Sequence, residues 1–549
     1  MKKVLLGVFL SLIILKILLA GLVTVPLGYS DSLAYMEQAK IFHDTGSVIA
    51  TIETAKFPPL YAIIISPAYY FQDMNAVFFA IKIINILLSS LAIFPAYFLS
   101  REFFKKKTSL ILATLTAFLP FTWTVTFYPF YENLYIPLLL TTIYFLYKAL
   151  TEEKKKWAII LVVSIVLCIL TRTLGIILFA ALVLLGLYFL INRNKKQVQR
   201  IGIILISSII LSLAYFYKAY NFLSSGYGGE VETASQIGIY LTKILWVFIY
   251  TNYLSISLGI IGFILLLQAY LHLKEFNQKE KIFLVLILCI SVTTIFLAAN
   301  NSGNTSISEY NEHRIIGRYI STILPFLIIG SALSFQKFKK IKKTPIIITS
   351  MLLLILTPLS MFGTFYPINN TELILIEILK IIFHYPNIFA TIGITIILFG
   401  LSISTLFLKK VKINTLFTIL LIYFIIVSLL NTGAITYDSE IRWEQLEEVQ
   451  IGNWINKNLP PNASFIIDKN NLECFEQGSN VDRTEENDRP LAVIAYWIRG
   501  EIKNRDEILF PCSQMESYEN YDYLITTKEL NLEKVKEGEN IKIYKVNGR

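Results

Sequence analysis

A polar stretch near the start of the chain holds the side chains best suited to acid–base chemistry. It spans residues 29–61, between two apolar segments, and contains several carboxylates and a lysine. Asp31 lies near its beginning, where a carboxylate could take a proton from a hydroxyl group as a general base. The structural alternative is that Asp31 caps a helix starting near Ser32. Tyr29 and Tyr61 stand at the two ends of the stretch and are candidate substrate-binding residues.

Glu132 is the second acidic candidate and lies in the sequence FYPFYENLYIPL. The structural alternative is an acid placed at a helix start, where the helix dipole favours it. The apolar pattern assigns Asp31 and Glu132 to successive turns on the same face of a membrane. The two acids could therefore meet across one cavity, and we treat both as candidate catalytic residues.

Four basic side chains could bind an anion on the same face. Lys56 precedes the sequence FPPLY. It could hold a phosphate as a point charge, or extend to the membrane interface. Arg172, in LTRTLG, falls at a break between two apolar runs, where a charge is costly unless it is paired. Arg314 and Arg318 are four residues apart, so one helical face could carry both. Their guanidinium groups suit phosphate oxygens, and the alternative is binding of lipid headgroups.

The composition is that of a multi-pass membrane protein. Of the 549 residues, 55% are hydrophobic and only 16% are charged, whereas soluble domains average roughly 25% charged residues. The mean hydropathy is +0.60. Neither a G-x-G-x-x-G nor a phosphate-binding P-loop pattern occurs, so no nucleotide site is indicated. We expect membrane lipids as partners and no nucleic acid.

Clusters of lysine and arginine orient the chain, because such clusters stay in the cytoplasm. They predict about 13 crossings of roughly 20 residues each, with the N-terminus inside, the C-terminus outside and a location in the cell membrane. The predicted spans are 4–26, 76–100, 108–127, 133–150, 157–170, 173–191, 200–222, 254–273, 282–300, 318–336, 345–364, 387–408 and 413–432.

The chain divides into two predicted domains. Residues 1–435 form an all-α transmembrane domain whose first external loop is 27–75, and residues 436–549 form a small external α/β domain. Amphipathic helices are predicted at the interface for 32–44 and 237–250. In the tail, the pattern predicts a helix over 444–459 and strands over 464–467, 491–494, 523–526 and 541–546.

Four cysteines are present. Cys168 and Cys289 fall within apolar runs and are expected to be buried fillers. Cys474 and Cys512 lie in the external tail, where oxidising conditions permit a disulfide between them; the alternative is two free thiols. No His/Cys cluster with zinc-binding spacing occurs.

Taken together, five segments resemble the C-type (GT-C) integral membrane glycosyltransferases. They are SDSLAYMEQAKIFHDTG, KFPPLY, YPFYENLY, LTRTLG and RIIGRYISTILP, in this order. The chain is most similar to the branch with protein O-mannosyltransferases, aminoarabinose transferases and lipopolysaccharide sugar transferases. The resemblance covers roughly residues 1–335. The WWD-type motif of oligosaccharyltransferases does not occur.

The resemblance implies an enzyme that takes a sugar from a polyprenyl-phosphate carrier and transfers it, with inversion, to a protein, lipid or glycan acceptor outside the membrane. Asp31 matches the acid of the first loop. Ser32 replaces the second acid that the family often has there, which puts a divalent metal at this position in doubt. Glu132 matches the acid of the second loop.

The resemblance also assigns the basic residues. Lys56 matches the lysine that contacts the carrier phosphate, although Phe57 is inserted before the prolines. Arg314, Arg318 and Tyr319 match a later loop that holds the same phosphate.

Two other functions fit parts of the pattern. A transporter or flippase of lipid-linked sugars would also have many helices and buried charges, but it predicts internal repeats and discontinuous helices. A noncatalytic membrane scaffold leaves the Asp31, Lys56 and Arg318 pattern unexplained.

Overall fold

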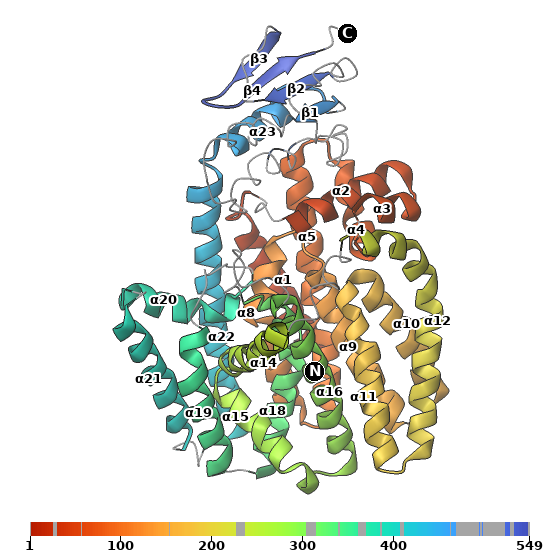
Figure 1. Ribbon diagram of the computed structural model, residues 1–549, viewed down its shortest axis with the longest axis vertical. Coiled ribbons are helices and arrows are strands. Elements are labelled where there is room, and N and C mark those ends of the chain that lie inside the picture. Colours follow the sequence, from red (N-terminus) through yellow and green to blue (C-terminus); the bar gives the residue numbers. More distant parts are fainter. Residues whose placement is uncertain are drawn as a thin grey trace.

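Apolar runs form helices through most of the chain, because a backbone in lipid must satisfy its hydrogen bonds internally. The computed structural model describes residues 2–25, 30–55, 57–152, 154–226, 237–303, 315–338, 341–360, 369–384, 387–406, 411–461, 463–467, 494, 497, 522–526 and 532–546. Within these ranges, a bundle of helices carries a small sheet at one end (Figure 1). The predicted fold class, an all-α membrane bundle with a small α/β tail, is confirmed.

The helices follow one another with short connections. In chain order they are α1 (Lys2–Ala20), α2 (Ser30–Thr45), α3 (Val48–Ala55), α4 (Leu60–Ile65), α5 (Met74–Ser90), α6 (Ile93–Arg101), α7 (Lys106–Ala117), α8 (Pro120–Thr124), α9 (Glu132–Thr151), α10 (Lys155–Thr171), α11 (Ile177–Ile191), α12 (Lys195–Gly226), α14 (Ile237–Ser257), α15 (Ile261–Leu271), α16 (Gln278–Gly303), α17 (Arg318–Ser321), α18 (Leu324–Phe338), α19 (Lys343–Ser360), α20 (Ile374–Ile382), α21 (Ile388–Ser404), α22 (Ile413–Tyr437) and α23 (Glu447–Asn458).

Many of these helices can cross a membrane. Among the described residues, seven are long and apolar enough by length and composition, and up to nine if each of two bent pairs is one span. Four shorter apolar helices add to these. The protein is therefore a multi-pass membrane protein, while the count of thirteen spans stays a prediction.

Two bends depart from the predicted spans, and the first, of 60°, lies between α7 and α8 inside the predicted span 108–127. The sequence predicts an interfacial helix over 237–250 followed by a span over 254–273, but α14 continues to Ser257 and meets α15 at an angle of 115°. Trp246 and Tyr250 are the aromatic side chains that an interfacial helix over 237–250 would place at the lipid headgroups, and they are 5% and 0% exposed. They therefore pack inside the protein and do not face lipid headgroups.

The C-terminal sheet has the strand order β1-β2-β4-β3. The strands are β1 (Phe465–Ile467), β2 (Tyr523–Thr526), β3 (Glu533–Glu537) and β4 (Lys542–Lys545), and only the β1–β2 pair is parallel. Three of the predicted strands match β1, β2 and β4. The strand β3 (EKVKE) was not predicted, because its high charge hides the alternation typical of a strand. Of the predicted strand 491–494, only Ile494 lies within the described residues.

Helix α23 joins the sheet to the bundle, at the end that carries α2 and the start of α5 (Figure 1). The Asn456 amide donates to the Asp73 carboxylate at 2.6 Å and accepts from the Met74 backbone N–H at 2.9 Å. Val449 and Trp497 share a buried apolar cluster with residues of α2, α4 and α5. The small sheet is thus attached over the predicted first external loop.

Candidate functional site

Tyr35 is the centre of an aromatic cluster that brings the two predicted external turns together. Its side chain is fully buried in α2. The Tyr35 ring lies 5.0 Å from that of Phe57, 5.4 Å from that of Tyr61 and 5.0 Å from that of Tyr131, measured between centroids. Phe57 follows Lys56 and Tyr131 precedes Glu132, so segments far apart in the chain meet here.

A buried amide strengthens this junction. The Gln38 side chain donates to the carbonyl of Thr51 at 2.9 Å and to that of Phe57 at 3.0 Å. Because Gln38 is one turn from Tyr35, helix α2 is tied to the segment around Phe57 by both aromatic and polar contacts.

Asp31 is the second residue of α2, one helical turn before Tyr35, so it lies within the first turn rather than at a cap before Ser32. Its side chain is outside the described residues, and so are Tyr29, Lys56 and Arg314. Cys474 and Cys512 also lie outside them, so their pairing stays a prediction.

Glu132 and Arg172 form a buried ion pair that the sequence did not predict. Glu132 begins α9, Arg172 follows the last residue of α10, and they are 0% and 3% exposed. The Arg172 Nη1 and Glu132 Oε1 atoms lie 3.4 Å apart. Within the described part of the chain, both Glu132 oxygens and both terminal nitrogens of Arg172 lack a hydrogen-bond partner. Buried polar groups normally have one, so this pair retains capacity to bind a ligand.

Aromatic faces surround the Arg172 guanidinium group. Its central carbon lies 4.7 Å from the ring centre of Tyr131, 5.6 Å from that of Tyr135 and 4.9 Å from that of Tyr319. Such faces stabilise a cation. Tyr319 comes from the segment after Gly317, so Arg172 links the second external turn to the third predicted site segment.

A tight turn fixes the position of Arg172. The helix α10 ends at Thr171, and the Gly175 backbone N–H donates to the Arg172 carbonyl at 2.8 Å. A Cβ atom at Gly175 would lie 2.8 Å from the backbone nitrogen of Ile169. Only glycine therefore allows this turn to fold back on α10 without a shift.

Arg318 approaches the same region from another side. Its guanidinium carbon lies 6.0 Å from the ring centre of Phe130. The preceding residue, Gly317, packs so closely on Tyr253 that an added Cβ would lie 2.1 Å from the Tyr253 hydroxyl. The next residue, Tyr319, accepts a hydrogen bond from the Asn301 amide at 3.0 Å.

Behind Gly317 lies a second buried carboxylate, Glu372, in the 3₁₀ turn Thr371–Leu373. It accepts hydrogen bonds from the hydroxyl groups of Tyr253 at 2.6 Å and Thr371 at 2.9 Å. Burial raises the pKa of Glu372, although these hydrogen bonds oppose the shift. Asn431 of α22 donates to the Thr371 carbonyl at 2.8 Å, so the turn is also tied to α22.

The predicted substrate-binding residue Tyr61 is part of an internal network. Its hydroxyl donates to Asn85 at 3.0 Å, and the Asn85 amide donates to the Tyr128 carbonyl at 2.6 Å. The Asn133 amide donates to the same Tyr128 carbonyl and to two more, those of Val125 and Phe130. The turn that carries Glu132 is therefore held from both sides.

Sequence reasoning missed two residues that shape the site, Tyr35 and Glu372, and it also missed the buried Lys82. Tyr35 lies in the stretch that the sequence singled out, Glu372 lies between two predicted spans, and Lys82 lies within the predicted span 76–100. Lys82 could have been found from the sequence, because it is a lysine inside an apolar run. A charge in such a run has a partner or a function. The buried Lys82 ammonium donates to the carbonyls of Ala20 at 2.7 Å and Val23 at 2.6 Å.

No group of three or more His, Cys, Asp or Glu side chains among the described residues could hold a metal ion. The Asp31 side chain is not part of this statement, because it lies outside the described residues.

Comparison with known proteins confirms the predicted resemblance to GT-C membrane glycosyltransferases. A family model described as dolichyl-phosphate-mannose-protein mannosyltransferase matches residues 56–217. Two crystal structures of ArnT from Cupriavidus metallidurans share the fold, one in the apo state and one bound to undecaprenyl phosphate. Their TM-scores are 0.57 and 0.58, with 12% identity over 99% of this chain and 98% of theirs. No curated protein matches the chain.

Proposed function

We propose that this chain, which has the fold of ArnT, transfers a sugar from a polyprenyl-phosphate-linked donor to an acceptor on the external face of the membrane. The donor class is supported by the ArnT structure bound to undecaprenyl phosphate. The reaction class is supported by the mannosyltransferase family model over residues 56–217. Neither the sugar nor the acceptor class, whether protein, lipid or glycan, is part of the proposal.

One observation carries the proposal most strongly. The buried Glu132–Arg172 pair has unused hydrogen-bonding atoms, lies among aromatic rings and falls within the segment that the family model matches. A buried arginine of this kind suits a phosphate, because its planar donors match phosphate oxygens. The aromatic faces suit the apolar face of a sugar or the first isoprene unit of a carrier.

The proposed reaction follows from these groups. The Asp31 carboxylate takes the proton from an acceptor hydroxyl, whose oxygen then forms a bond to the anomeric carbon of the sugar. The bond from that carbon to the phosphate oxygen breaks, and its electron pair leaves with polyprenyl phosphate. Attack from the face opposite the phosphate inverts the anomeric configuration.

Charge grows on the leaving phosphate during this step. In the proposal Lys56, Arg314 and Arg318 neutralise it, which lowers the energy of the transition state. Glu132 keeps Arg172 oriented at 3.4 Å and serves as the second acid of the site. Tyr319 and Tyr61 are held in position beside the site by their hydrogen bonds with Asn301 and Asn85.

The reaction is tested by transfer of labelled sugar from a panel of polyprenyl-phosphate sugars in membranes that contain the protein. Asp31-dependent release of polyprenyl phosphate, lost in Asp31→Asn, would support the proposal and identify the donor. Equal turnover in both proteins would exclude Asp31 as the base and direct attention to Glu132.

The flippase alternative is favoured by two breaks among the described helices, the one between α14 and α15 at 115° and the one between α7 and α8 at 60°. The same membranes therefore need a second assay, for movement of lipid-linked sugar between the two leaflets of sealed vesicles. Movement without transfer of any donor would contradict the transferase and favour the flippase.

A further inference from the structure

A hollow of about 870 Å³ opens at the end of the bundle opposite the C-terminal sheet. It is lined by the connection from α6 to α7 together with Gln336 of α18 and Ile413, the first residue of α22. From this end α22 runs the length of the bundle toward the sheet (Figure 1). The volume lies within the range of small-molecule pockets. Nothing in the proposed transfer reaction uses this hollow.

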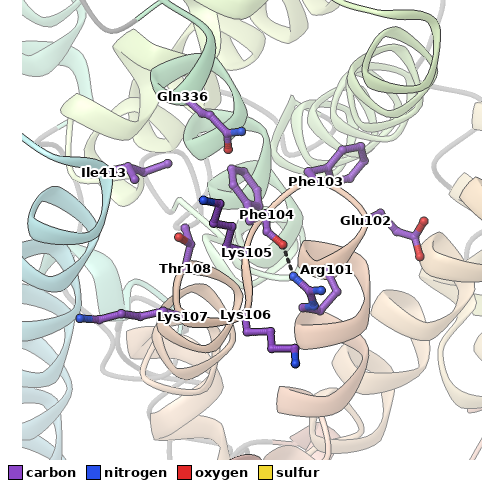
Figure 2. Close-up of a pocket in the computed structure, with 10 residues that line it drawn as sticks. All are labelled: Arg101, Glu102, Phe103, Phe104, Lys105, Lys106, Lys107, Thr108, Gln336 and Ile413. Atoms are coloured by element: carbon purple, nitrogen blue, oxygen red, sulfur yellow. Dashed lines mark hydrogen bonds between the residues drawn. The ribbon is translucent and has the colours of Figure 1, made fainter. Parts of the chain in front are cut away.

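The lining is strongly basic. Arg101, Lys105, Lys106 and Lys107 contribute four positive charges. The only acid of the lining, Glu102, lies 3.0 Å from the ammonium of Lys148, which already balances its charge. Figure 2 shows Lys105 directed between Ile413 and Phe104, with Lys106 and Lys107 spreading away from it. In the described part of the chain, no carboxylate lies within ion-pairing distance of these three lysines.

Two helix starts add to the positive charge. The helix α7 begins at Lys106 and α22 begins at Ile413, and both have a lysine at the N-cap, Lys105 and Lys412. Neither cap side chain accepts a hydrogen bond from the first turn. The N-terminal end of a helix carries a partial positive charge, which repels a lysine ammonium placed there. An anion bound between the two positive charges would remove this repulsion.

A second lysine triplet shows how the general bias of membrane proteins toward cytoplasmic lysines is accommodated by local partners. Lys154, Lys155 and Lys156 also lie at the start of a helix, since Lys154 is the N-cap of α10 and α10 begins at Lys155. There Lys154 pairs with Glu152 at 3.3 Å, and the Lys156 ammonium lies 4.8 Å from the ring centre of Trp157. Orientation of the chain therefore explains lysines at this face, but not a hollow lined by three lysines that have no carboxylate partner among the described residues.

We propose that this hollow binds an anionic, phosphate-bearing ligand. The basic groups and the two helix starts would donate to phosphate oxygens, and Thr108, whose hydroxyl already donates to Asn414 at 2.8 Å, holds the starts of α7 and α22 together. The phosphate can belong to a membrane lipid headgroup or to a small soluble molecule, and the test separates the two sources.

The lipid source is tested on the purified full-length protein by native mass spectrometry with phosphatidylglycerol and phosphatidylcholine. The variant K105Q/K106Q/K107Q is compared with the matched variant K154Q/K155Q/K156Q, which loses the same charge on the same face. A lysine near an anionic surface contributes roughly fivefold in affinity. We expect K105Q/K106Q/K107Q to bind phosphatidylglycerol at least about tenfold more weakly than wild type does. We expect K154Q/K155Q/K156Q to bind it as wild type does.

The soluble source is tested by thermal unfolding with inorganic phosphate or pyrophosphate at constant ionic strength. A saturable rise in the melting temperature that is lost only in K105Q/K106Q/K107Q would identify a soluble phosphate as the ligand. The variant Gln336→Trp fills the hollow without changing charge and should abolish whichever binding is found. Equal loss in both triple variants, or no binding of any probe, would overturn the proposal.

Discussion

At the residue scale, Glu132 and Arg172 balance each other's charge where neither reaches water. Removing one partner of a buried ion pair typically costs about 3–5 kcal/mol, because the remaining charge stays buried without compensation. We therefore expect Glu132→Gln to lower the free energy of unfolding by an amount in this range. Thermal or denaturant unfolding of the purified protein in detergent measures the change.

The double variant Glu132→Gln/Arg172→Met is the control for this prediction. It removes both charges together, so it should recover most of the stability that the single variant loses. A double variant as unstable as the sum of the two single variants would show that the side chains do not compensate each other.

Both residues of this pair were identified from the sequence as candidates, but not as partners. An acid at a helix start and an arginine at a break are visible as local patterns. Their contact depends on how α9 and α10 pack, and a one-dimensional pattern does not contain that information. For the same reason Glu372 was missed, since only its burial against Tyr253 distinguishes it from an ordinary loop acid.

At the element scale, the short helix α17 owes its position to the glycine that precedes it. A Cβ atom at Gly317 would lie 2.1 Å from the Tyr253 hydroxyl and 2.6 Å from the Asn369 carbonyl. We expect Gly317→Ala to displace Arg318, to lower stability by about 1–3 kcal/mol and to raise KM for the lipid donor more than it lowers kcat. Steady-state transfer kinetics measure the shift.

The matched control is Gly433→Ala in α22, where an added Cβ meets nothing within 4 Å. This variant adds the same methyl group to the same protein and should keep wild-type kinetics. Unchanged KM in Gly317→Ala would mean that Arg318 does not depend on this contact.

The end of α1 offers another test at the element scale. The last carbonyls of a helix lack partners within it. The Lys82 ammonium of α5 donates to the carbonyl of Ala20, the last residue of α1, and to that of Val23 just beyond it. We expect Lys82→Met to free the end of α1 and to speed backbone hydrogen exchange there by at least about tenfold, since hydrogen bonds to a charged group contribute about 1.5–3 kcal/mol. Lys82→Arg keeps a donor and should retain more protection, and equal exchange in wild type and Lys82→Met would contradict the prediction.

Helix existence was easier to predict than helix shape. Long apolar runs such as 76–100 and 133–150 appear as helices, because length and hydropathy decide them. The bend between α14 and α15 was missed. It depends on positive φ angles of 70° at Gly259 and 57° at Ile260, and an apolar pattern does not reveal these.

At the scale of the whole molecule, the two ends differ in charge and in architecture. Basic clusters gather at the end with the hollow, while the sheet and α23 cover the end with the candidate site. The positive-inside trend then predicts that the sheet faces the exterior. In cells expressing a protein without Cys474 and Cys512, an impermeant thiol reagent should label Glu533→Cys directly and Lys279→Cys only after permeabilisation. The reverse labelling would invert the orientation.

The burial of Glu132 also has a consequence for the order in which the protein is made. Its partner Arg172 is synthesised only after the whole of α9 and α10, so α9 reaches the translocon with a carboxylate that nothing yet balances. An uncompensated charge disfavours transfer into lipid. The helices α9 and α10 therefore gain a stable place in the bilayer as a hairpin rather than one after the other, and the Glu132–Arg172 pair forms during biogenesis, at the moment when this hairpin closes.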